Sequence, residues 1–176
     1  MTFAETGLSG LVLIELEPLA DERGSFARTF DAAKWEAHGI PSTVVQCSVS
    51  RNHRQGTLRG MHYQAEPHGE TKLVRCGRGA IFDVAVDLRP DSTTFRRWFG
   101  EELSETNGRM LHIPAGFAHG FLTLADESEV VYQMADPYVA DAARGLRYDD
   151  PAFAIQWPAA PVVISDRDRT YPDFAA

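Results

Sequence analysis

The sequence predicts an all-β protein, built as a β-sandwich or jelly-roll barrel with a few short helices. Short runs rich in β-branched and aromatic residues follow one another along the chain, turn residues separate them, and one short segment reads as a helix. The clearest run covers residues 80–88, where four apolar side chains share one face while Asp83 and Asp87 lie on the other. A small barrel of this kind can hold one ligand among side chains from several strands.

The individual elements follow from local patterns. Strands are expected at residues 11–17, 43–49, 57–63, 71–75, 80–88, 95–102, 109–113, 120–124 and 129–134. A helix is expected at residues 32–38, because Asp31 suits its N-cap and Gly39 follows its end. The dipeptide Asn107-Gly108 is a strong signal for a β-hairpin.

Size, charge and hydropathy exclude several classes of protein. The 176 residues, 44% hydrophobic and 24% charged, suit one globular domain over residues 1–176. The net charge of −8 argues against nucleic-acid binding, although a few local arginines suffice to bind a phosphate-bearing small molecule. No apolar run approaches the roughly 20 residues of a membrane-spanning helix, and the first residues do not read as a signal peptide. We therefore expect a cytoplasmic protein without membrane contacts, in which Cys47 and Cys76 are free and buried.

Two segments carry spaced glycine, histidine and proline residues. The first contains Gly56, His62, Gln64, Glu70 and Gly77, and the second contains Gly108, Pro114, Gly116 and His119. Their spacing resembles the two motifs of the cupin superfamily, which implies a cupin-type jelly-roll β-barrel. Metal-binding cupins carry His-x-His and a Glu in the first motif, but Gln64 takes the second His position here and Glu70 lies too far along the chain. Because a transition metal needs three or four converging His, Cys or carboxylate ligands, we expect no metal.

Several polar residues permit two interpretations when each is taken alone. Alternation along residues 59–64 places His62 on the face opposite Arg59, where it is either a satisfied core histidine or a catalytic base. Lys72 reads most simply as a solvated strand lysine, and Tyr132 as a core aromatic with a bonded hydroxyl. Residues 166–169 read most simply as a solvated charge run.

Together these features resemble one enzyme family across nearly the whole chain. The matching blocks are residues 21–24, 58–64, 72–75, 82–89, 113–121, 132, 144–145, 149–151 and 165–168. They resemble the dTDP-4-dehydrorhamnose 3,5-epimerase family. The resemblance implies an isomerase that inverts carbons 3 and 5 of dTDP-4-dehydro-6-deoxy-D-glucose and needs no cofactor, because the ketone of the substrate serves as the electron sink.

The resemblance also implies a role for each catalytic residue. His62, paired with Asp168, removes a proton from a carbon beside the ketone, and a His pKa near 6.5 suits that task. Lys72 stabilises the enolate that develops on the ketone oxygen, and Tyr132 returns a proton from the opposite face.

A further set of residues matches family positions around the substrate. Arg23 and Arg59 contact the diphosphate, which suits a planar guanidinium with several donors. The other substrate-binding matches are Phe26, Gln46, His119, Tyr138 and Arg167. The family forms homodimers in which N-terminal strands cross to the partner, so Arg23 and Phe26 are expected to serve the neighbouring subunit's site.

Four positions depart from the family pattern, at Arg28, Ser48, Ala143 and Arg167. The family carries Glu, Asn, Glu and Lys there, so the first three changes affect the nucleotide end and leave open a CDP or GDP sugar in place of dTDP. Inversion at one carbon only also stays open. The competing interpretations are a metal-dependent cupin oxygenase or isomerase and a non-catalytic cupin that binds a sugar nucleotide.

Overall fold

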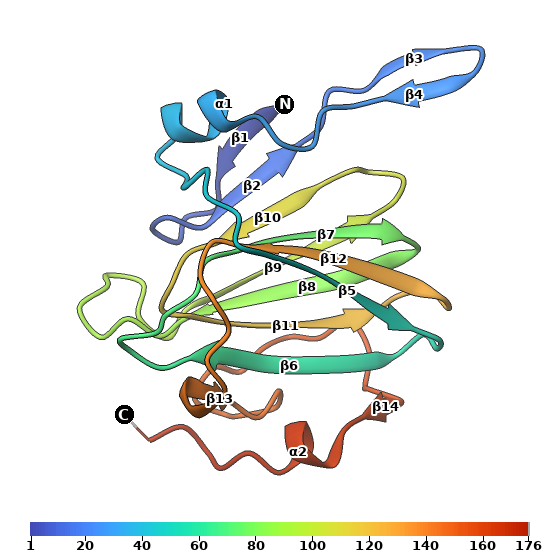
Figure 1. Ribbon diagram of the computed structural model, residues 1–176. Helices are drawn as coiled ribbons and strands as arrows, with labels where there is room; N and C mark the ends of the chain where they lie inside the picture. Colours follow the sequence, from blue (N-terminus) through green and yellow to red (C-terminus); the bar gives the residue numbers. More distant parts are fainter. Residues whose placement is uncertain (176) are drawn as a thin grey trace.

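Two antiparallel β-sheets face each other and form a barrel (Figure 1). The computed structural model describes residues 1–175. Sheet I has the strand order β1 (Thr2–Glu5), β2 (Val12–Glu15), β10 (Met110–Ile113), β7 (Lys72–Arg78), β12 (Ser128–Met134) and β5 (Gln46–Asn52). Sheet II has the order β13 (Ala143–Gly145), β6 (Thr57–Gln64), β11 (Phe117–Thr123), β8 (Ala80–Asp87) and β9 (Trp98–Ser104).

The remaining elements are short. Strand β14 (Val163–Ile164) pairs in parallel with β6, and β3 (Leu19–Asp21) with β4 (Gly24–Phe26) forms a separate hairpin. The helical elements are α1 (Ala32–Ala37), the 3₁₀ turn η1 (Ala140–Ala142) and α2 (Asp166–Arg169). No helix in residues 1–175 is long and apolar enough to cross a membrane.

The all-β jelly-roll prediction is confirmed, and each expected strand is present with shifted ends. The predicted helix also forms, with Asp31 accepting a hydrogen bond from the Lys34 amide and Gly39 at φ +70° beyond its end. The hairpin expected at Asn107-Gly108 is wrong. Strand β9 belongs to sheet II and β10 to sheet I, so this turn carries the chain from one sheet to the other. A turn signal specifies the reversal of the chain but not whether its flanking strands pair.

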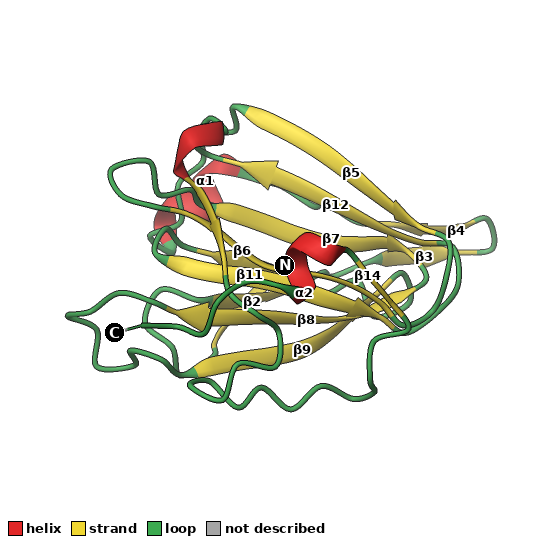
Figure 2. Cartoon of the chain, turned by 90° about the horizontal axis from the view of Figure 1, so that it is seen from below, coloured by secondary structure: helices red, strands yellow, loops and turns green. Residues whose placement is uncertain are grey.

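Apolar side chains fill one part of the barrel interior. They come from both sheets and from the loop before β2: Leu8, Leu11, Val74, Cys76, Ile81, Ala85, Leu103, Leu111, Ile113, Phe117, Phe121 and Val130. The alternation predicted for β8 is correct, and both of its faces are buried, because residues 146–174 cover the outer face of sheet II (Figure 2). Asp83 and Asp87 on the inner face are fully buried.

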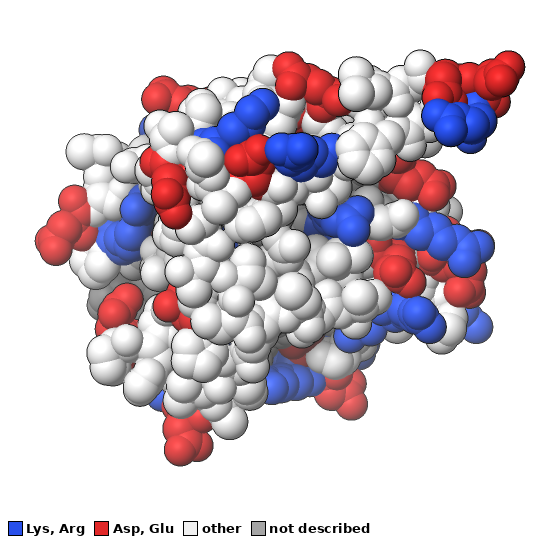
Figure 3. Space-filling view, turned by 45° about the horizontal axis from the view of Figure 1, so that its top comes forward, with Lys and Arg blue, Asp and Glu red and all other residues white. Residues whose placement is uncertain are grey.

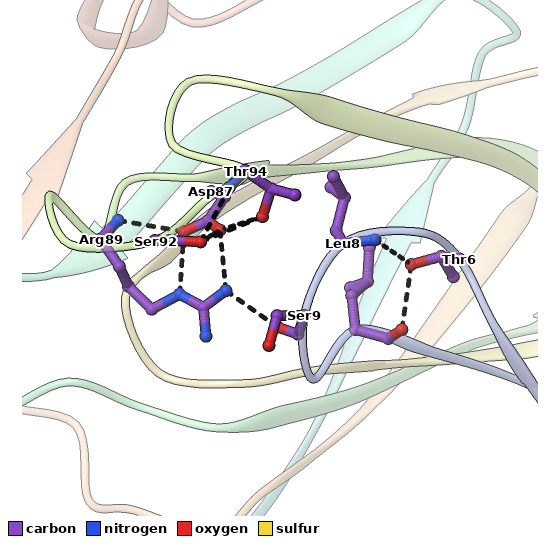
Figure 4. Close-up of polar contacts among 8 residues, drawn as sticks. Thr6, Leu8, Ser9, Asp87, Arg89, Ser92 and Thr94 are labelled. Carbon is purple, nitrogen blue, oxygen red and sulfur yellow. Dashed lines mark hydrogen bonds and ion pairs between the residues drawn. The ribbon is translucent and has the colours of Figure 1, made fainter.

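Asp87 holds the loop that follows β8 (Figure 4). Its carboxylate accepts hydrogen bonds from Arg89, Ser92 and Thr94, and the Arg89 guanidinium also donates to the Ser9 carbonyl at 2.8 Å. Burial raises the pKa of Asp87, but these bonds outweigh it and hold the pKa well below its usual range. The ionised carboxylate therefore ties the loop after β8 to the N-terminal loop.

The two cysteines differ in their exposure to solvent. Cys76 is buried, and burial raises the pKa of its thiol to about 11, which makes it inert. Cys47 is exposed, so the expectation of a buried thiol is wrong there. It lies on edge strand β5, whose outer face no other strand or helix covers in the described part of the chain.

His112 makes the fold sensitive to acid. Burial lowers its pKa to about 4, and its Nε2 atom has no hydrogen-bond partner among residues 1–175. The unfolded chain binds a proton near pH 6.5 while the folded chain resists it, so stability is full above pH 6.5 and falls as the pH drops towards 4. We expect this one group to remove about 2–3 kcal/mol of unfolding free energy over that window.

The measurement is denaturant unfolding between pH 7.5 and 4.5 for the wild type and His112→Gln. The variant should lose less stability over this range, and the exposed-site control His68→Gln should behave as the wild type. Equal pH dependence in all three proteins would contradict the assignment.

Candidate active site

A cavity of about 680 Å³ opens between the sheets beside the apolar core. Strands β5, β7 and β12 of sheet I and β6 and β11 of sheet II contribute to its wall. The lining residues are Gln46, Cys47, Ser48, Ser50, Arg59, His62, Tyr63, Gln64, Glu70, Lys72, His119, Phe121, Tyr132, Met134, Tyr138, Ala143, Arg144 and Arg167. Most of the side chains predicted to bind or transform a substrate therefore lie in one place.

A bulge in β6 shapes this wall. His119 of β11 pairs with His62, but Phe121 pairs with Arg59, so β6 carries one extra residue between these two pairs. The predicted alternation, with Arg59 opposite His62, is therefore wrong: both side chains line the cavity. The bulge depends on a close approach of two glycines, because a Cβ on Gly60 would lie 2.5 Å from the Gly120 Cα.

His62 and Asp168 form a hydrogen-bonded pair, with 2.7 Å between Nε2 and Oδ1. The second carboxylate oxygen accepts the Gly60 amide at 3.2 Å, and Ser165 caps helix α2 by accepting the Asp168 amide. Burial raises the pKa of Asp168, but hydrogen bonding from His62 and Gly60 outweighs it and keeps the pKa below its ordinary value. The simple interpretation of residues 166–169 as solvated charges is thus wrong for Asp168, which is buried.

The pair fixes which ring nitrogen of His62 can act. An ionised carboxylate only accepts hydrogen bonds, so Nε2 must carry the hydrogen that it donates to Asp168. In the neutral ring Nδ1 then holds the free lone pair and is the nitrogen that can take up a proton.

Lys72 begins β7 and lies buried in the cavity wall, where its ammonium forms an ion pair with Glu70. Burial lowers the pKa of Lys72, and the negative charges of Glu70 and Asp136 oppose that shift. The interpretation of Lys72 as a solvated strand lysine is therefore wrong.

Tyr132 reaches the cavity from β12 in sheet I, which faces the sheet that carries His62. Burial and the nearby Asp83 raise the pKa of its phenol far above the usual value, so the hydroxyl stays protonated. Its ring lies edge-on to His119, with centroids 6.0 Å apart. His119 in turn bonds through Nε2 to the buried Asp83 at 2.7 Å, and burial raises the pKa of that carboxyl.

Other expected binding residues also line the cavity. Arg59 donates to Asn52 at 2.7 Å, and the Gln46 side chain accepts the Tyr138 amide at 2.9 Å. Arg167 lies on α2 beside the dyad, with its guanidinium 5.8 Å from the Tyr171 ring centroid. The cavity wall therefore carries several cations suited to an anionic ligand.

Arg23 and Phe26 lie elsewhere in this chain, on the β3–β4 hairpin that projects from the barrel (Figure 1). Arg23 pairs with Asp21 at the exposed hairpin tip, and Phe26 is 71% exposed. Figure 3 shows the charges of this tip at the upper right, away from the body of the molecule. Among the described residues, neither side chain lines the cavity of its own chain.

The positions that depart from the family pattern at the nucleotide end lie in two places. Arg28 pairs with Asp31 at the start of α1, whereas Ser48 and Ala143 line the cavity as small side chains. Gln64, which takes the place of a metal-binding histidine, bonds to the backbone of His68, Pro137 and Val139. Within residues 1–175 no group of three or more His, Cys, Asp or Glu side chains could hold a metal ion.

Sequence reasoning missed two residues of the site. Alternation places Asp83 on the face of residues 80–88 opposite the apolar side chains, but nothing in the sequence tells which of the two faces is the inner one. Glu70 reads from the sequence only as a displaced metal ligand. Its position two residues before Lys72 was the signal for an ion pair, because residues i and i+2 share a strand face.

The geometry suits proton transfer beside a carbonyl group. Sheet II offers an imidazole oriented by a carboxylate, and sheet I offers a protonated phenol and a buried ammonium that line the same cavity. A model of the dTDP-4-dehydrorhamnose 3,5-epimerase family matches residues 5–176. The chain belongs to this family.

Three members of the dTDP-4-dehydrorhamnose 3,5-epimerase family illustrate the match. The enzyme of Methanothermobacter thermautotrophicus is 46% identical, over 96% of this chain and 92% of its own. The Bacillus anthracis enzyme, solved with TDP and PPi bound, superposes with a TM-score of 0.95 at 40% identity, over 98% of this chain and 99% of its own. The Legionella pneumophila enzyme, in complex with dTDP-4-keto-L-rhamnose, has a TM-score of 0.90 at 37% identity and 99% coverage of both chains. The family resemblance and fold class predicted from the sequence are thus confirmed.

The close approach of Gly60 and Gly120 can be tested against a matched glycine. Gly60 has φ +134° and no room for a Cβ, whereas Gly24 has φ +128° with nothing within 4 Å. Gly60→Ala should therefore cost at least about 2 kcal/mol more unfolding free energy than Gly24→Ala. Equal losses in denaturant unfolding would show that backbone conformation alone, and not the contact, requires Gly60.

Proposed function

We propose that the chain inverts carbons 3 and 5 of dTDP-4-dehydro-6-deoxy-D-glucose to give dTDP-4-dehydro-L-rhamnose. The observation that carries this proposal is the arrangement of His62 on sheet II and Tyr132 on sheet I around one cavity. Inversion at a carbon requires a proton to leave from one face and another to arrive at the other. A base and a phenol on opposing sheets meet that requirement.

In this mechanism His62 is the base. Its Nδ1 atom takes the proton from the carbon beside the ketone, and the imidazolium that forms is stabilised by the Asp168 carboxylate. General base catalysis of this kind contributes about 10²–10⁴ in rate.

Lys72 stabilises the negative charge that moves onto the ketone oxygen. A donor placed at a developing oxyanion contributes about 3–4 kcal/mol to transition-state stabilisation. Because Lys72 is buried, its charge acts in a site of low dielectric constant, where it is more effective than in water.

Tyr132 donates the second proton. Burial and Asp83 keep its hydroxyl protonated, so it is ready to give a proton to the enolate carbon. The ketone holds the electron pair during the reaction, so no metal or nicotinamide cofactor is required.

The nucleotide end is held by the cations of the cavity. Arg59 and Arg167 line the wall next to the dyad and suit the diphosphate, while Gln46, Tyr138 and His119 surround the sugar and nucleoside. dTDP is the favoured nucleotide, because solved relatives carry TDP or dTDP-4-keto-L-rhamnose. A CDP or GDP sugar is the alternative, since Ser48 and Ala143 at the nucleotide end depart from the family pattern.

The enzyme works as a cytoplasmic homodimer of one-domain subunits, residues 1–176, in which the β3–β4 hairpin reaches the partner. The hairpin leaves Leu19 76% and Phe26 71% exposed, and Val44, Val45 and Val49 near β5 are exposed as well. Apolar surface of this kind favours a protein partner. In the dimer Arg23 and Phe26 contribute to the neighbouring subunit's cavity.

The reaction is tested by NMR of the sugar ring protons in deuterated water. The wild type should exchange the protons at carbons 3 and 5 of dTDP-4-dehydro-6-deoxy-D-glucose, and His62→Ala should slow exchange by at least about 10²-fold. Exchange at a single carbon would identify a monoepimerase. Absence of exchange in the folded wild type with dTDP, CDP and GDP substrates would refute the proposal.

The phenol role gives a separate expectation. Tyr132→Phe keeps the base but lacks the second proton donor, so it should still exchange ring protons for deuterium while forming epimerised product at least about 10²-fold more slowly than the wild type. Equal loss of exchange and inversion would assign Tyr132 to the first proton transfer instead. The conservative change leaves the ring packing against His119 in place.

The shared site is tested by mixing Arg23→Ala and His62→Ala, each of which should be inactive by itself. If Arg23 serves the partner's cavity, each mixed dimer holds one complete site, and an equal mixture should recover roughly a quarter of the wild-type activity. Subunit exchange is verified with a mass tag on one variant. No recovery in mixtures that contain mixed dimers would place Arg23 outside the partner's site.

A further inference from the structure

Glu70 lies against the ammonium of Lys72 inside the cavity. The two residues stand two positions apart, so they share the cavity-facing side where β7 begins, and each side chain is 11% exposed. Thr71 between them points its amide to Asp136, with 2.9 Å from N to Oδ2, which anchors this end of the strand to the loop after β12. This bond fixes the backbone between the two charged side chains.

A carboxylate is unexpected at this place. Of the described residues that line the cavity, Glu70 is the single acid, among the cationic side chains of Arg59, Lys72, Arg144 and Arg167 and the histidines His62 and His119. A cavity that binds a nucleoside diphosphate gains affinity from cations and loses it from an acid. The position of Glu70 therefore calls for a function other than substrate binding.

The burial of Lys72 indicates what that function is. An ammonium removed from water tends to lose its proton, and a neutral amine cannot stabilise an enolate. Two carboxylates counter this tendency at Lys72: Glu70 in direct contact and Asp136 at longer range, with one oxygen of Asp136 already bonded to the Thr71 amide. The other titratable groups that line the cavity, besides the arginines, are the thiol, imidazole and phenol side chains of Cys47, His62, Tyr63, His119, Tyr132 and Tyr138, and none of these groups carries a negative charge in its ordinary state.

We propose that Glu70 is the positioning residue of Lys72: it keeps the buried ammonium protonated and occupies one of its three N–H donors, so that the others face the cavity. The proposal rests on the proposed role of Lys72 at the ketone oxygen. Glu70 makes no contact with the reacting carbons in this scheme and acts through Lys72 alone.

The chain offers an unusually clean test, because it contains only two lysines, Lys34 and Lys72. Lysine labelled with ¹³C at the ε-carbon therefore gives two NMR signals, and Lys72→Arg identifies which belongs to Lys72. Lys34 on the exposed face of α1 serves as an internal reference. In Glu70→Gln, which keeps the size and a hydrogen-bond acceptor but removes the charge, the Lys72 titration midpoint should fall by about one pH unit or more.

The matched control is Glu66→Gln, the same chemical change four residues earlier and outside the cavity lining. It should leave both lysine signals unmoved. An unchanged Lys72 midpoint in Glu70→Gln overturns the proposal, whatever the activity of the variant.

Deuterium exchange measured against pH connects the charge to the reaction. The alkaline limb of kcat/KM for Glu70→Gln should move to lower pH by the same amount as the Lys72 midpoint, while a loss of structure would lower the rate at every pH. A shifted midpoint with an unmoved limb shows that exchange does not use the Lys72 charge, and this overturns the proposal. Failure of the wild type to exchange any keto sugar refutes the proposed function separately, because the lysine titration needs no substrate.

Discussion

The contact between Gly60 and Gly120 is the constraint on which the site depends. Because neither residue carries a side chain, β6 and β11 approach closely enough to accommodate an extra residue in β6. That residue turns Arg59 and His62 to the same side and leaves the Gly60 amide free to bond to Asp168. One local distortion therefore turns the Arg59 guanidinium and the His62 imidazole into a single cavity. It also positions the Gly60 amide to bond to Asp168, the partner of His62.

The two sheets divide the chemistry between them. Sheet II supplies the oriented imidazole, and sheet I supplies the buried phenol and the ammonium. The environments differ accordingly, since His62 is partly open to the cavity, whereas Lys72 is buried and Tyr132 is partly buried, and burial lowers the pKa of Lys72 and raises the pKa of Tyr132. Burial disfavours the charged form of each side chain. It therefore keeps the Tyr132 hydroxyl protonated, but it favours loss of the proton from Lys72, whose ammonium depends on the neighbouring carboxylates.

Alternation and turn residues were sufficient to predict the strands and helix α1, whereas the set of side chains that meet in the cavity followed from the family resemblance and not from alternation. Sequence patterns failed where partners come from remote parts of the chain. The hairpin at Asn107-Gly108 was wrong because pairing depends on both sheets, and the side assigned to Arg59 was wrong because a bulge adds one residue to the count. The burial of Asp168 likewise depends on contact with a strand 106 residues earlier.

That separation has a consequence for biogenesis. A ribosome completes the chain from its N-terminus, so every strand of the barrel interior and His62 itself are made before Asp168. A nascent chain can thus pair both sheets while its imidazole still lacks a carboxylate. The pair of His62 and Asp168 can therefore form only once the C-terminal segment has been made and has packed against β6.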